Sequence, residues 1–581
     1  MPTSGACLVP LTAIAFVAAA IAQAPPGFVD LSVPGGVLAS GVTASGKLVL
    51  YRNGNFLRVF SAVTNQWHAH TPSFGTSTVL KKDMLLVPES DRWTAFSAYR
   101  GVFATQLVPY SPTAMQHDDS VACVRDGSTL HTFSAFTGRW NTRQVPTGWV
   151  LELGPRAALL RTPAVGANLG ASVFDAFTDS WYDIPPQPLG LFGSRLAGGS
   201  VVVATSQQLF GFSALRPGWV QHAIASPGPF PFISLLYFES ELVGMRGHVF
   251  SGVRGTFAAP PVLPSTGSFG VSQNVASLQE GNLRWALGAG SNTWISLPDD
   301  LAIGAGTNVV QAYGGGQMYA FSPLTDTVAA TPWTQGPGST GQNGGNVVTV
   351  FDAPTGSRPV FSAFTGAWYS PPAGTLPELA WTARNAALYR TTNGLLAFAA
   401  PAAAFVPLTG TNLTRNNGYT ASDPTTLHVF DAHGARWLSH PRQAGTGYGP
   451  TFGERTMVAT DPNWLLAFSS RGRRLVSMPL PEAVADAQAS DDVAFARTAT
   501  HVLAFSGLAD TTGWQDAPDG IYGAGLGATA TVQARVPAGH FVVLGFGPPA
   551  IAPIVLPPYG ELWLDLAATV TLALAAPPGE A

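Results

Sequence analysis

The stretch FSAFTGRW, from Phe133 to Trp140, decides the fold of this chain. An aromatic residue is followed by Ser and a small residue, then by a Thr-Gly turn, and a second bulky residue completes the stretch. Close copies are FSAVTNQW (Phe60 to Trp67), FDAFTDSW (Phe174 to Trp181), FSAFTGAW (Phe361 to Trp368) and FDAHGARW (Phe430 to Trp437). The copies recur about every 37 residues, a period typical of solenoids, propellers and arrays. The sequence is therefore one repeated β-unit.

Two positions of the unit recur along the chain. The first slot holds Phe60, Phe96, Phe133, Phe174, Phe212, Phe250, Phe321, Phe361, Phe398, Phe430, Phe468 and Phe505, with Leu287 as the exception. The partner slot holds Trp67, Phe103, Trp140, Trp181, Trp219, Phe257, Trp294, Val328, Trp368, Phe405, Trp437 and Leu475, while Trp514 lies two residues further on. Residues this uniform across copies share an internal role, and we expect them to pack in the core between neighbouring units.

Each unit divides into short strands between turn signals. In the third unit these are DSVACVRDG (Asp119 to Gly127), STLHTFSA (Ser128 to Ala135) and RWNTRQV (Arg139 to Val145), and WVLELG (Trp149 to Gly154) opens the next. Strands such as SVVVAT (Ser200 to Thr205) are apolar on both faces, as in sheets buried on both sides. Radially stacked blades bury both faces of every sheet, so the pattern predicts an all-β fold, a β-propeller.

The ends of the chain predict how the blades close. Phe28 to Val33 resembles the strand that begins at the partner slot, yet no unit precedes it. We expect it to complete the blade of Leu287 and close a first seven-bladed ring, residues 23–293. Trp294 to Leu297 would then close a second seven-bladed ring, residues 294–548, whose last unit would combine GATATVQARV (Gly527 to Val536) with HFVVLGF (His540 to Phe546).

A single ring of thirteen or fourteen blades is the alternative, because nothing near residue 295 resembles a long linker. Residues 549–581 contain ELWLDLAATVTLALAA (Glu561 to Ala576), which we expect to form an appended β-hairpin or tail.

FSAFTGRW and its copies resemble the second half of a kelch repeat, in which an aromatic residue, a turn with Thr and Gly, and a spaced Trp recur. Gly198-Gly199 before Phe212 is the best-placed copy of the kelch double glycine. The resemblance implies a kelch-like propeller over most of residues 28–519. It does not imply the activity of the copper radical oxidases, which join a cysteine to a tyrosine and add histidine ligands. Only Cys123 could serve as that cysteine, and no motif places a tyrosine and two histidines with it.

Composition excludes some partners. Only 11% of the residues are charged, and the formal net charge is -4. Such a chain has no basic field that would attract nucleic acid or an anionic membrane. Residues 8–22, LVPLTAIAFVAAAIA, form an apolar run that ends in Ala-Ile-Ala, as in a secretory signal peptide. We therefore expect residues 1–22 to be a signal peptide and the mature protein to be secreted, periplasmic or at the cell surface. A single N-terminal membrane anchor is the alternative.

Several polar groups are candidate site residues. His68 and His70 lie two apart on a predicted strand and could ligate a metal, but an outer strand with two solvated histidines is the preferred interpretation. The other candidates are His117-Asp118-Asp119, Asp299-Asp300, Asp491-Asp492, Cys123, the arginines Arg471, Arg473 and Arg474, and a formal dinucleotide fingerprint from Gly336 to Gly341. Each has a simpler interpretation as a solvated turn, a buried small residue or a loop. We therefore predict no catalytic, cofactor or metal residue, and the binding residues stay unknown.

The preferred function is a secreted, monomeric, noncatalytic propeller that binds a glycan, a protein or a cell-envelope component. The alternatives are an extracellular hydrolase, lyase or oxidoreductase with a site at a central channel, which leaves no local sequence signature, and a structural envelope protein.

Overall fold

The computed structural model describes residues 28–509, except 34, 39–40, 55, 74–76, 109–114, 164–167, 186, 225–241, 263–267, 299–301, 306–307, 335, 374, 376–380, 411–412, 416–418 and 443–448, and the backbone of four strands between 541 and 575. All regular elements of this part of the chain are β-strands. We find in it no apolar helix of membrane-crossing length.

Thirteen antiparallel sheets follow one another around the molecule, and we call them blades 1 to 13 in chain order. Blade 1 consists of β2 (Val42–Ser45), β3 (Leu48–Asn53), β4 (Phe56–Ser61) and β5 (Gln66–His70), and blade 2 of β6 (Val79–Leu80), β7 (Met84–Pro88), β8 (Trp93–Ser97) and β9 (Val102–Gln106). Blade 3 consists of β10 (Met115–His117), β11 (Val121–Asp126), β12 (Thr129–Ser134) and β13 (Arg139–Gln144). Blade 4 consists of β14 (Val150–Leu153), β15 (Ala157–Arg161), β17 (Ala171–Asp175) and β18 (Ser180–Asp183).

Blade 5 consists of five strands, β16 (Asn168–Leu169), β19 (Gln187–Ala197), β20 (Ser200–Thr205), β21 (Gln208–Ser213) and β22 (Arg216–Ala223), and blade 6 of three, β23 (Leu242–Met245), β24 (His248–Ser251) and β25 (Thr256–Ala258). Blade 7 consists of β26 (Ser268–Val271), β27 (Val275–Glu280), β28 (Leu283–Gly288) and β29 (Trp294–Leu297). Blade 8 consists of β30 (Ala302–Ala305), β31 (Val310–Gly314), β32 (Gln317–Ser322) and β33 (Thr327–Pro332).

Blade 9 consists of β34 (Thr340–Asn343), β35 (Val347–Phe351), β36 (Val360–Ser362) and β37 (Ala367–Tyr369), and blade 10 of β38 (Trp381–Ala383), β39 (Ala386–Thr391), β40 (Gly394–Ala399) and β41 (Ala404–Thr409). Blade 11 consists of β42 (Thr414–Arg415), β43 (Thr420–Ser422), β44 (Thr426–Asp431) and β45 (Arg436–Pro441). Blade 12 consists of β46 (Thr451–Phe452), β47 (Thr456–Thr460), β48 (Trp464–Ser469) and β49 (Arg474–Pro479). Blade 13 combines β50 (Asp486–Ala489), β51 (Val493–Arg497) and β52 (His501–Ser506) with β1 (Phe28–Ser32), the first strand of the described residues.

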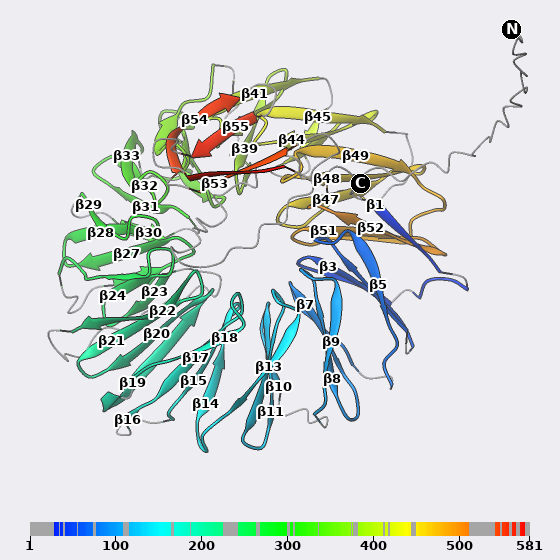
Figure 1. Ribbon diagram of the computed structural model, residues 1–581. Helices are drawn as coiled ribbons and strands as arrows, with labels where there is room; N and C mark the ends of the chain where they lie inside the picture. The colour runs from blue at the N-terminus through cyan, green and yellow to red at the C-terminus, as the bar shows by residue number, and fades with distance from the viewer. Residues whose placement is uncertain are drawn as a thin grey trace, which may run out of the picture.

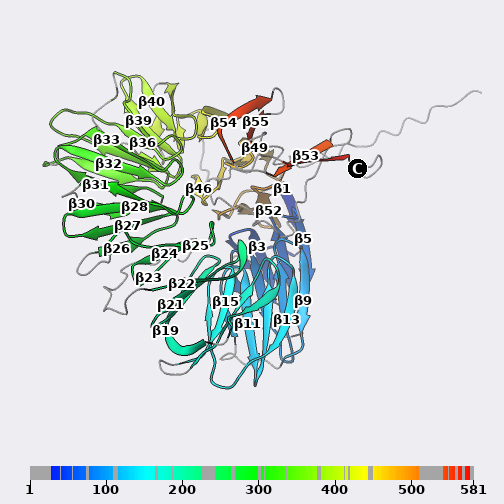
Figure 2. The ribbon, with the colours of Figure 1, turned by 60° about the vertical axis from the view of Figure 1, so that its left-hand side comes forward.

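The blades form one large ring, so the prediction of two seven-bladed rings is wrong and its alternative is confirmed (Figure 1). The clasp was assigned to the wrong blade. β1 pairs with β52, not with the blade of Leu287, and the two strands lie side by side in both views (Figures 1 and 2). β29, predicted to close a second ring, is the ordinary fourth strand of blade 7 and pairs with β28.

The clasp itself occupies the position that its sequence predicts. Phe28 stands opposite Phe505 in the register, as Trp140 stands opposite Phe133, and the Phe28 and Phe505 rings are 5.1 Å apart. The indole of Trp67 in blade 1 donates a hydrogen bond of 3.3 Å to the carbonyl of Val29. β1 therefore acts as the outer strand of blade 13 and joins it to blade 1.

The core consists of hydrophobic clusters between neighbouring blades. Every occupant of the first slot is buried, as predicted, and Phe133 is 0% exposed. The cluster that closes the ring packs Val49, Tyr51 and Phe60 of blade 1 against Phe495 and other residues of blade 13. It is built like the cluster of Val121, Ala158 and Phe174 between blades 3 and 4 and the others around the ring. Burial between blades, and not within an isolated sheet, therefore stabilises each repeat.

The serine after the first slot adds a directional bond between blades. The Ser61 hydroxyl donates a hydrogen bond of 2.6 Å to the carbonyl of Ala98 in the next blade, and the Ser506 hydroxyl closes the series by donating to Ala62 at 2.7 Å. The same bond is made by Ser97, Ser134, Ser213, Ser251, Ser322, Ser362 and Ser469. The serine of the repeat therefore links consecutive blades, a role that spacing alone did not reveal.

The remaining strands belong to no blade. β53 (Phe541–Phe546) pairs with β56 (Val570–Ala575), and β54 (Pro549–Leu556) pairs with β55 (Gly560–Leu564). β54, β55 and β56 lie within residues 549–581, whose assignment as an appended β-hairpin or tail stays a prediction. The predicted signal peptide of residues 1–22, the segment 527–536 and Trp514 lie outside the described residues.

Candidate functional site

In an antiparallel blade the turn after the first strand and the turn after the third strand lie at the same end. We call this end of the ring the turn rim. Backbone hydrogen bonds connect successive first turns along it, from Lys47 N to Lys82 O (2.8 Å) and onward through the blades, and Asp492 N closes the series on Gly46 O at 3.0 Å. The rim thus carries side chains of neighbouring blades at close and regular spacing.

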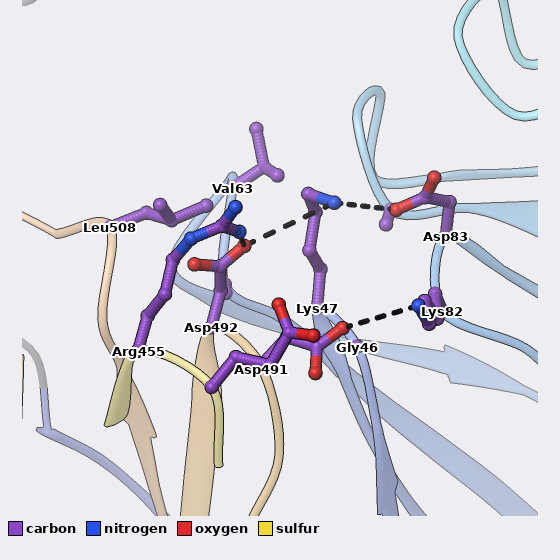
Figure 3. Close-up of polar contacts among 12 residues, drawn as sticks. Gly46, Lys47, Val63, Lys82, Asp83, Arg455, Asp491, Asp492 and Leu508 are labelled. Atoms are coloured by element: carbon purple, nitrogen blue, oxygen red, sulfur yellow. Dashed lines mark hydrogen bonds and ion pairs between the residues drawn. The ribbon is translucent and has the colours of Figure 1, made fainter. Parts of the chain in front are cut away.

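Charged residues occupy the rim where the ring closes. We define the charged arc as Lys47, Lys82, Asp83, Asp119, Arg455, Arg471, Asp491 and Asp492. Figure 3 shows Lys47 between two carboxylates, with its Nζ 2.7 Å from Asp83 and 4.0 Å from Asp492. The Lys82 Nζ is 3.7 Å from Asp119 and 4.0 Å from Asp491. Opposite charges therefore alternate across blades 12, 13, 1, 2 and 3.

Burial makes these charges depend on one another. Asp492 has a side chain that is 0% exposed and is also approached by Arg455 at 3.5 Å and by Arg471 at 3.3 Å. Burial opposes the charge on Lys47, but charge interactions with the phenol group of Tyr99 and with Asp83 and Asp492 outweigh it, so the pKa of Lys47 is raised. Removing one partner would therefore leave a buried charge uncompensated.

Burial also acts on the carboxylates of the arc. It raises the pKa of Asp119 and of Asp491 above the usual carboxyl value, although Lys82 acts in the opposite direction on both. The Asp119 and Asp491 carboxyls therefore take up a proton at a higher pH than an ordinary carboxyl does.

Amides replace the charges on another part of the rim. Asn274 donates to Asn308 at 2.9 Å, Asn308 to Asn346 at 3.0 Å, and Asn346 to Asn385 at 2.7 Å, each through Nδ2 to Oδ1. The series ends where Asn385 Nδ2 lies 3.1 Å from Nε2 of His433. We call these four residues the asparagine ladder; it crosses blades 7 to 10.

Aromatic side chains follow the second turns of blades 2 to 4. The rings of Tyr99 and Phe136 are 4.5 Å apart, and those of Phe136 and Phe177 are 4.2 Å apart. Lys47 lies 5.2 Å from the centre of the Tyr99 ring, and Arg156 lies 5.9 Å from that of Phe177. This half-buried aromatic stripe is held between two cations.

A recess opens on the rim between the ladder and the charged arc. It has a volume of about 40 Å³ and lies at blades 10 to 12. Its polar wall includes Arg384, Arg455, Arg471, Glu454 and His433, and its apolar wall includes Val429, Phe430, Met457 and Phe468. The recess combines an apolar surface with a few convergent polar groups, which is typical of small-ligand sites.

The structure separates most candidate residues suggested by the sequence. His68 and His70 lie on the outer strand β5 and both face blade 2, where their rings are 5.2 Å from Phe96 and 4.8 Å from Phe103. His70 Nε2 is 3.4 Å from the buried Glu89. No group of three or more potential metal ligands occurs among the described residues. The two histidines thus pack between blades and are less solvated than predicted.

Other candidates have structural surroundings. Cys123 is buried in β11, and burial raises the pKa of its thiol to about 12, so it is unreactive in neutral solution. Residues 336–339 form a loop, and the last two residues of the fingerprint, Thr340 and Gly341, begin β34. Asp119 pairs with Lys82 in the charged arc. Asp299 and Asp300 lie outside the described residues.

Two interpretations need correction because they treated turn residues as solvated. Asp492 is fully buried and shared by three cations, since the turns of blades 12, 13 and 1 converge on it. Arg471 is largely buried and points to Asp492, so the solvated interpretation is wrong for this residue. The side chain of Arg473 is 49% exposed, as that interpretation requires, and lies 3.6 Å from Asp431.

Sequence reasoning missed Lys47 and the asparagine ladder, although a signal was present. Lys47, Asn308 and Asn385 each stand 13 residues before a first-slot Phe, and so do Arg455 and Asp492. This position precedes the second strand of each blade. A polar residue that recurs at one offset from a buried residue could have indicated the rim.

Comparisons with known proteins add little about function. No protein-family profile and no curated protein matches the chain. Among solved structures, the extracellular domain of BT4673 from B. thetaiotaomicron is 9% identical, with 84% of each chain covered and a TM-score of 0.17. Apo AztD from Citrobacter koseri is 10% identical, with 56% of this chain and 93% of that chain covered and a TM-score of 0.20. Function must therefore be argued from the residues themselves.

Proposed function

We propose that this protein is a secreted, noncatalytic binding protein and that its ligand site is the recess on the turn rim. The observation that supports the proposal is the convergence of Arg384, Arg455, Arg471 and His433 on one concave surface with an apolar wall. The ring supplies a scaffold that holds these groups on the turns of three consecutive blades. The apolar run of residues 8–22 supports export.

The kelch-like character of the repeat is part of this proposal. It is supported by the FSAFTGRW motif, whose first aromatic residue is buried between blades and whose Trp140 indole donates 3.1 Å to Ala104 of the preceding blade.

Binding of a glycan, protein or cell-envelope component can be tested with the purified chain from residue 23. We would probe an array of glycans and cell-envelope fractions with the wild type and with Arg384→Glu, which reverses a charge in the recess. The matched control is Arg143→Glu on β13, because Arg143 forms an exposed pair with Asp183 away from the recess. We expect saturable binding that Arg384→Glu weakens at least about tenfold, since a charged hydrogen bond contributes 1.5–3 kcal/mol.

The control should bind like the wild type. Equal binding by all three proteins would contradict the recess as the site. Conversion of a bound compound to a product would contradict the noncatalytic function.

A further inference from the structure

We infer that protonation of His433 reverses every hydrogen bond of the asparagine ladder, so that a change of charge at the recess alters the first turn of blade 7. The ladder ends on Nε2 of His433 and consists of Asn274, Asn308, Asn346 and Asn385. The inference goes beyond the proposed function, because it does not require a ligand in the recess.

The ladder has a direction, because each amide offers a donor on one side and an acceptor on the other. Nδ2 of Asn274 donates to Oδ1 of Asn308, and the same order repeats at Asn346 and Asn385. At the last step Nδ2 of Asn385 lies 3.1 Å from Nε2 of His433. An amide nitrogen can only donate, so Nε2 accepts this bond and the imidazole is neutral, with its proton on Nδ1.

Only the ladder and His433 fix this direction. Among the described residues we find no other hydrogen bond made by the four amide side chains. Rotation of an amide by a half turn exchanges its oxygen and its nitrogen and nearly preserves its shape. A ladder in which all four amides have rotated therefore contains as many bonds as the present one.

A protonated imidazole carries a hydrogen on both nitrogens, so Nε2 of His433 would face Nδ2 of Asn385 as donor to donor. If only Asn385 rotated, the same conflict would move to Asn346, and rotation there would move it to Asn308. The conflict disappears when Asn274 has rotated as well. A buried donor without an acceptor costs about 1–3 kcal/mol. Complete reversal avoids this cost, because every bond of the ladder is formed again in the opposite direction.

The two ends of the ladder differ from its middle in a way that permits reversal. Asn308 and Asn346 are buried, whereas Asn274 and His433 are half-buried. In the present direction the ladder does not use Oδ1 of Asn274, and after reversal it does not use Nδ2. Water can bond to either atom at a half-buried position. The first turn of blade 7 would thus offer a donor in place of an acceptor.

His433 shares its surroundings with several other titratable or charged groups. Asp431 lies in the same turn and contacts Arg436 and Arg473, and the recess wall adds Arg384, Tyr419, Glu454, Arg455 and Arg471. Imidazole is the only one of these chemical types that ordinarily changes charge between pH 5 and 8. A pH change in this range therefore reaches the ladder through His433.

The test follows the side-chain signals of 15N-labelled asparagine by NMR in the purified protein between pH 5 and 8, together with the imidazole nitrogens of His433. We compare the wild type with His433→Gln and with the control His440→Gln, because His440 lies on the same blade and contacts the carbonyl of Pro441. In the wild type we expect all four ladder signals to shift together, at the pH at which His433 takes up its proton. The shifts should be lost in His433→Gln and kept in His440→Gln.

A third variant, Asn346→Ala, separates reversal from a local effect because it interrupts the ladder. It should keep the shift of Asn385 and remove the shifts of Asn274 and Asn308. In the wild type, a shift confined to Asn385 would mean that the last bond breaks without reversal, and it would overturn the inference whether or not the variants fold. Constant ladder signals, or a His433 that stays neutral over the whole range, would also overturn it. So would a shift of Asn274 that persists in Asn346→Ala.

Discussion

The charged arc and the asparagine ladder occupy equivalent positions of the same repeat, yet they join blades by different chemistry. In the ladder Asn308 accepts a bond of 2.9 Å from Asn274 and donates one of 3.0 Å to Asn346, and Asn346 accepts and donates in the same way. In the arc an ion needs an opposite charge on the next blade, and Asp492 serves three cations. The ladder therefore repeats the same amide-to-amide bond from blade to blade, whereas each ion of the arc needs a particular residue of opposite charge on the neighbouring blade.

The charged arc, and not the asparagine ladder, lies where the ring closes. The arc crosses blades 13 and 1, where residues far apart in the sequence must find each other, and the ladder joins blades that are consecutive in the chain. Pairing of unlike charges discriminates between partners more strongly than pairing of identical amides. The arc thus helps to specify which turn meets which at the closure.

Removal of β1 should have the largest effect, because it acts on the closure and leaves the ladder blades intact. Deletion of residues 28–33 exposes the edge of β52 and the side chain of Phe505. We expect a melting temperature reduced by more than any single substitution reduces it. Addition of the peptide FVDLSV should restore part of the loss, and a scrambled peptide should not; an unchanged melting temperature would refute the clasp.

Substitution in the first slot should affect both regions equally, because the aromatic core is the same below the arc and below the ladder. Phe133 and Phe361 are both 0% exposed. We expect Phe133→Ala and Phe361→Ala each to reduce the free energy of unfolding by about 3–5 kcal/mol through lost burial and a cavity. Denaturant unfolding measures this, with the exposed Val63→Ala as control. A clear difference between the two variants would show that rim chemistry influences the core below it.

Loss of the charged bonds or of the amide bonds should distinguish the regions. Asp492→Asn leaves three cations without their buried carboxylate, and we expect it to cost about 3 kcal/mol. Asn346→Ala removes the bonds to Asn308 and Asn385 without burying a charge, and we expect a cost of about 1–2 kcal/mol. Chemical unfolding at neutral pH gives both values. The opposite order would mean that the arc contributes less to stability than the ladder.

The smallest expected effect concerns pH. Asp175 stands where most blades have the linking serine, and burial raises its pKa to about 6 although Thr178 and Phe177 N–H bond to it. Because the pKa in the folded protein lies above the unfolded value of 3.8, this group contributes stability below about pH 4 that is lost as the pH rises through 6. Asp175→Ser should therefore be more stable than the wild type by roughly 2 kcal/mol at pH 7, with a smaller difference at pH 4.

Thermal unfolding across this pH range measures the difference. Asp431→Ser is the matched control, because Asp431 occupies the same position but has Arg436 at 3.3 Å as a partner. A gain in Asp431→Ser equal to that in Asp175→Ser would show that burial of Asp175 is not the cause.

The strands and the core were predictable because each depends on a local pattern. The strands predicted in the third unit begin and end within about two residues of β11, β12 and β13, and Phe133 was correctly placed in the core. Phe28 was correctly recognised as the occupant of a partner slot.

The number of rings was not predictable in the same way. Every first slot offers β1 a similar partner, so Leu287 and Phe505 cannot be distinguished by the residues around them. Which one is used depends on a small rotation added at each blade interface, and no single residue encodes that rotation. The recess was hidden for a related reason, because Arg384 and Arg471 come from turns whose contact requires the blades between them.

The pairing of β1 with β52 has a consequence for how the chain is made. Val29 stands opposite Ala504, so β1 has no partner strand until β52 has been synthesised. Blades between them can fold as they emerge, whereas the edge of β1 stays unsatisfied until residue 506 has been synthesised. A premature stop anywhere upstream therefore yields an open array with two exposed edges. Exposed strand edges promote aggregation, so the pairing of β1 with β52 protects the closed ring.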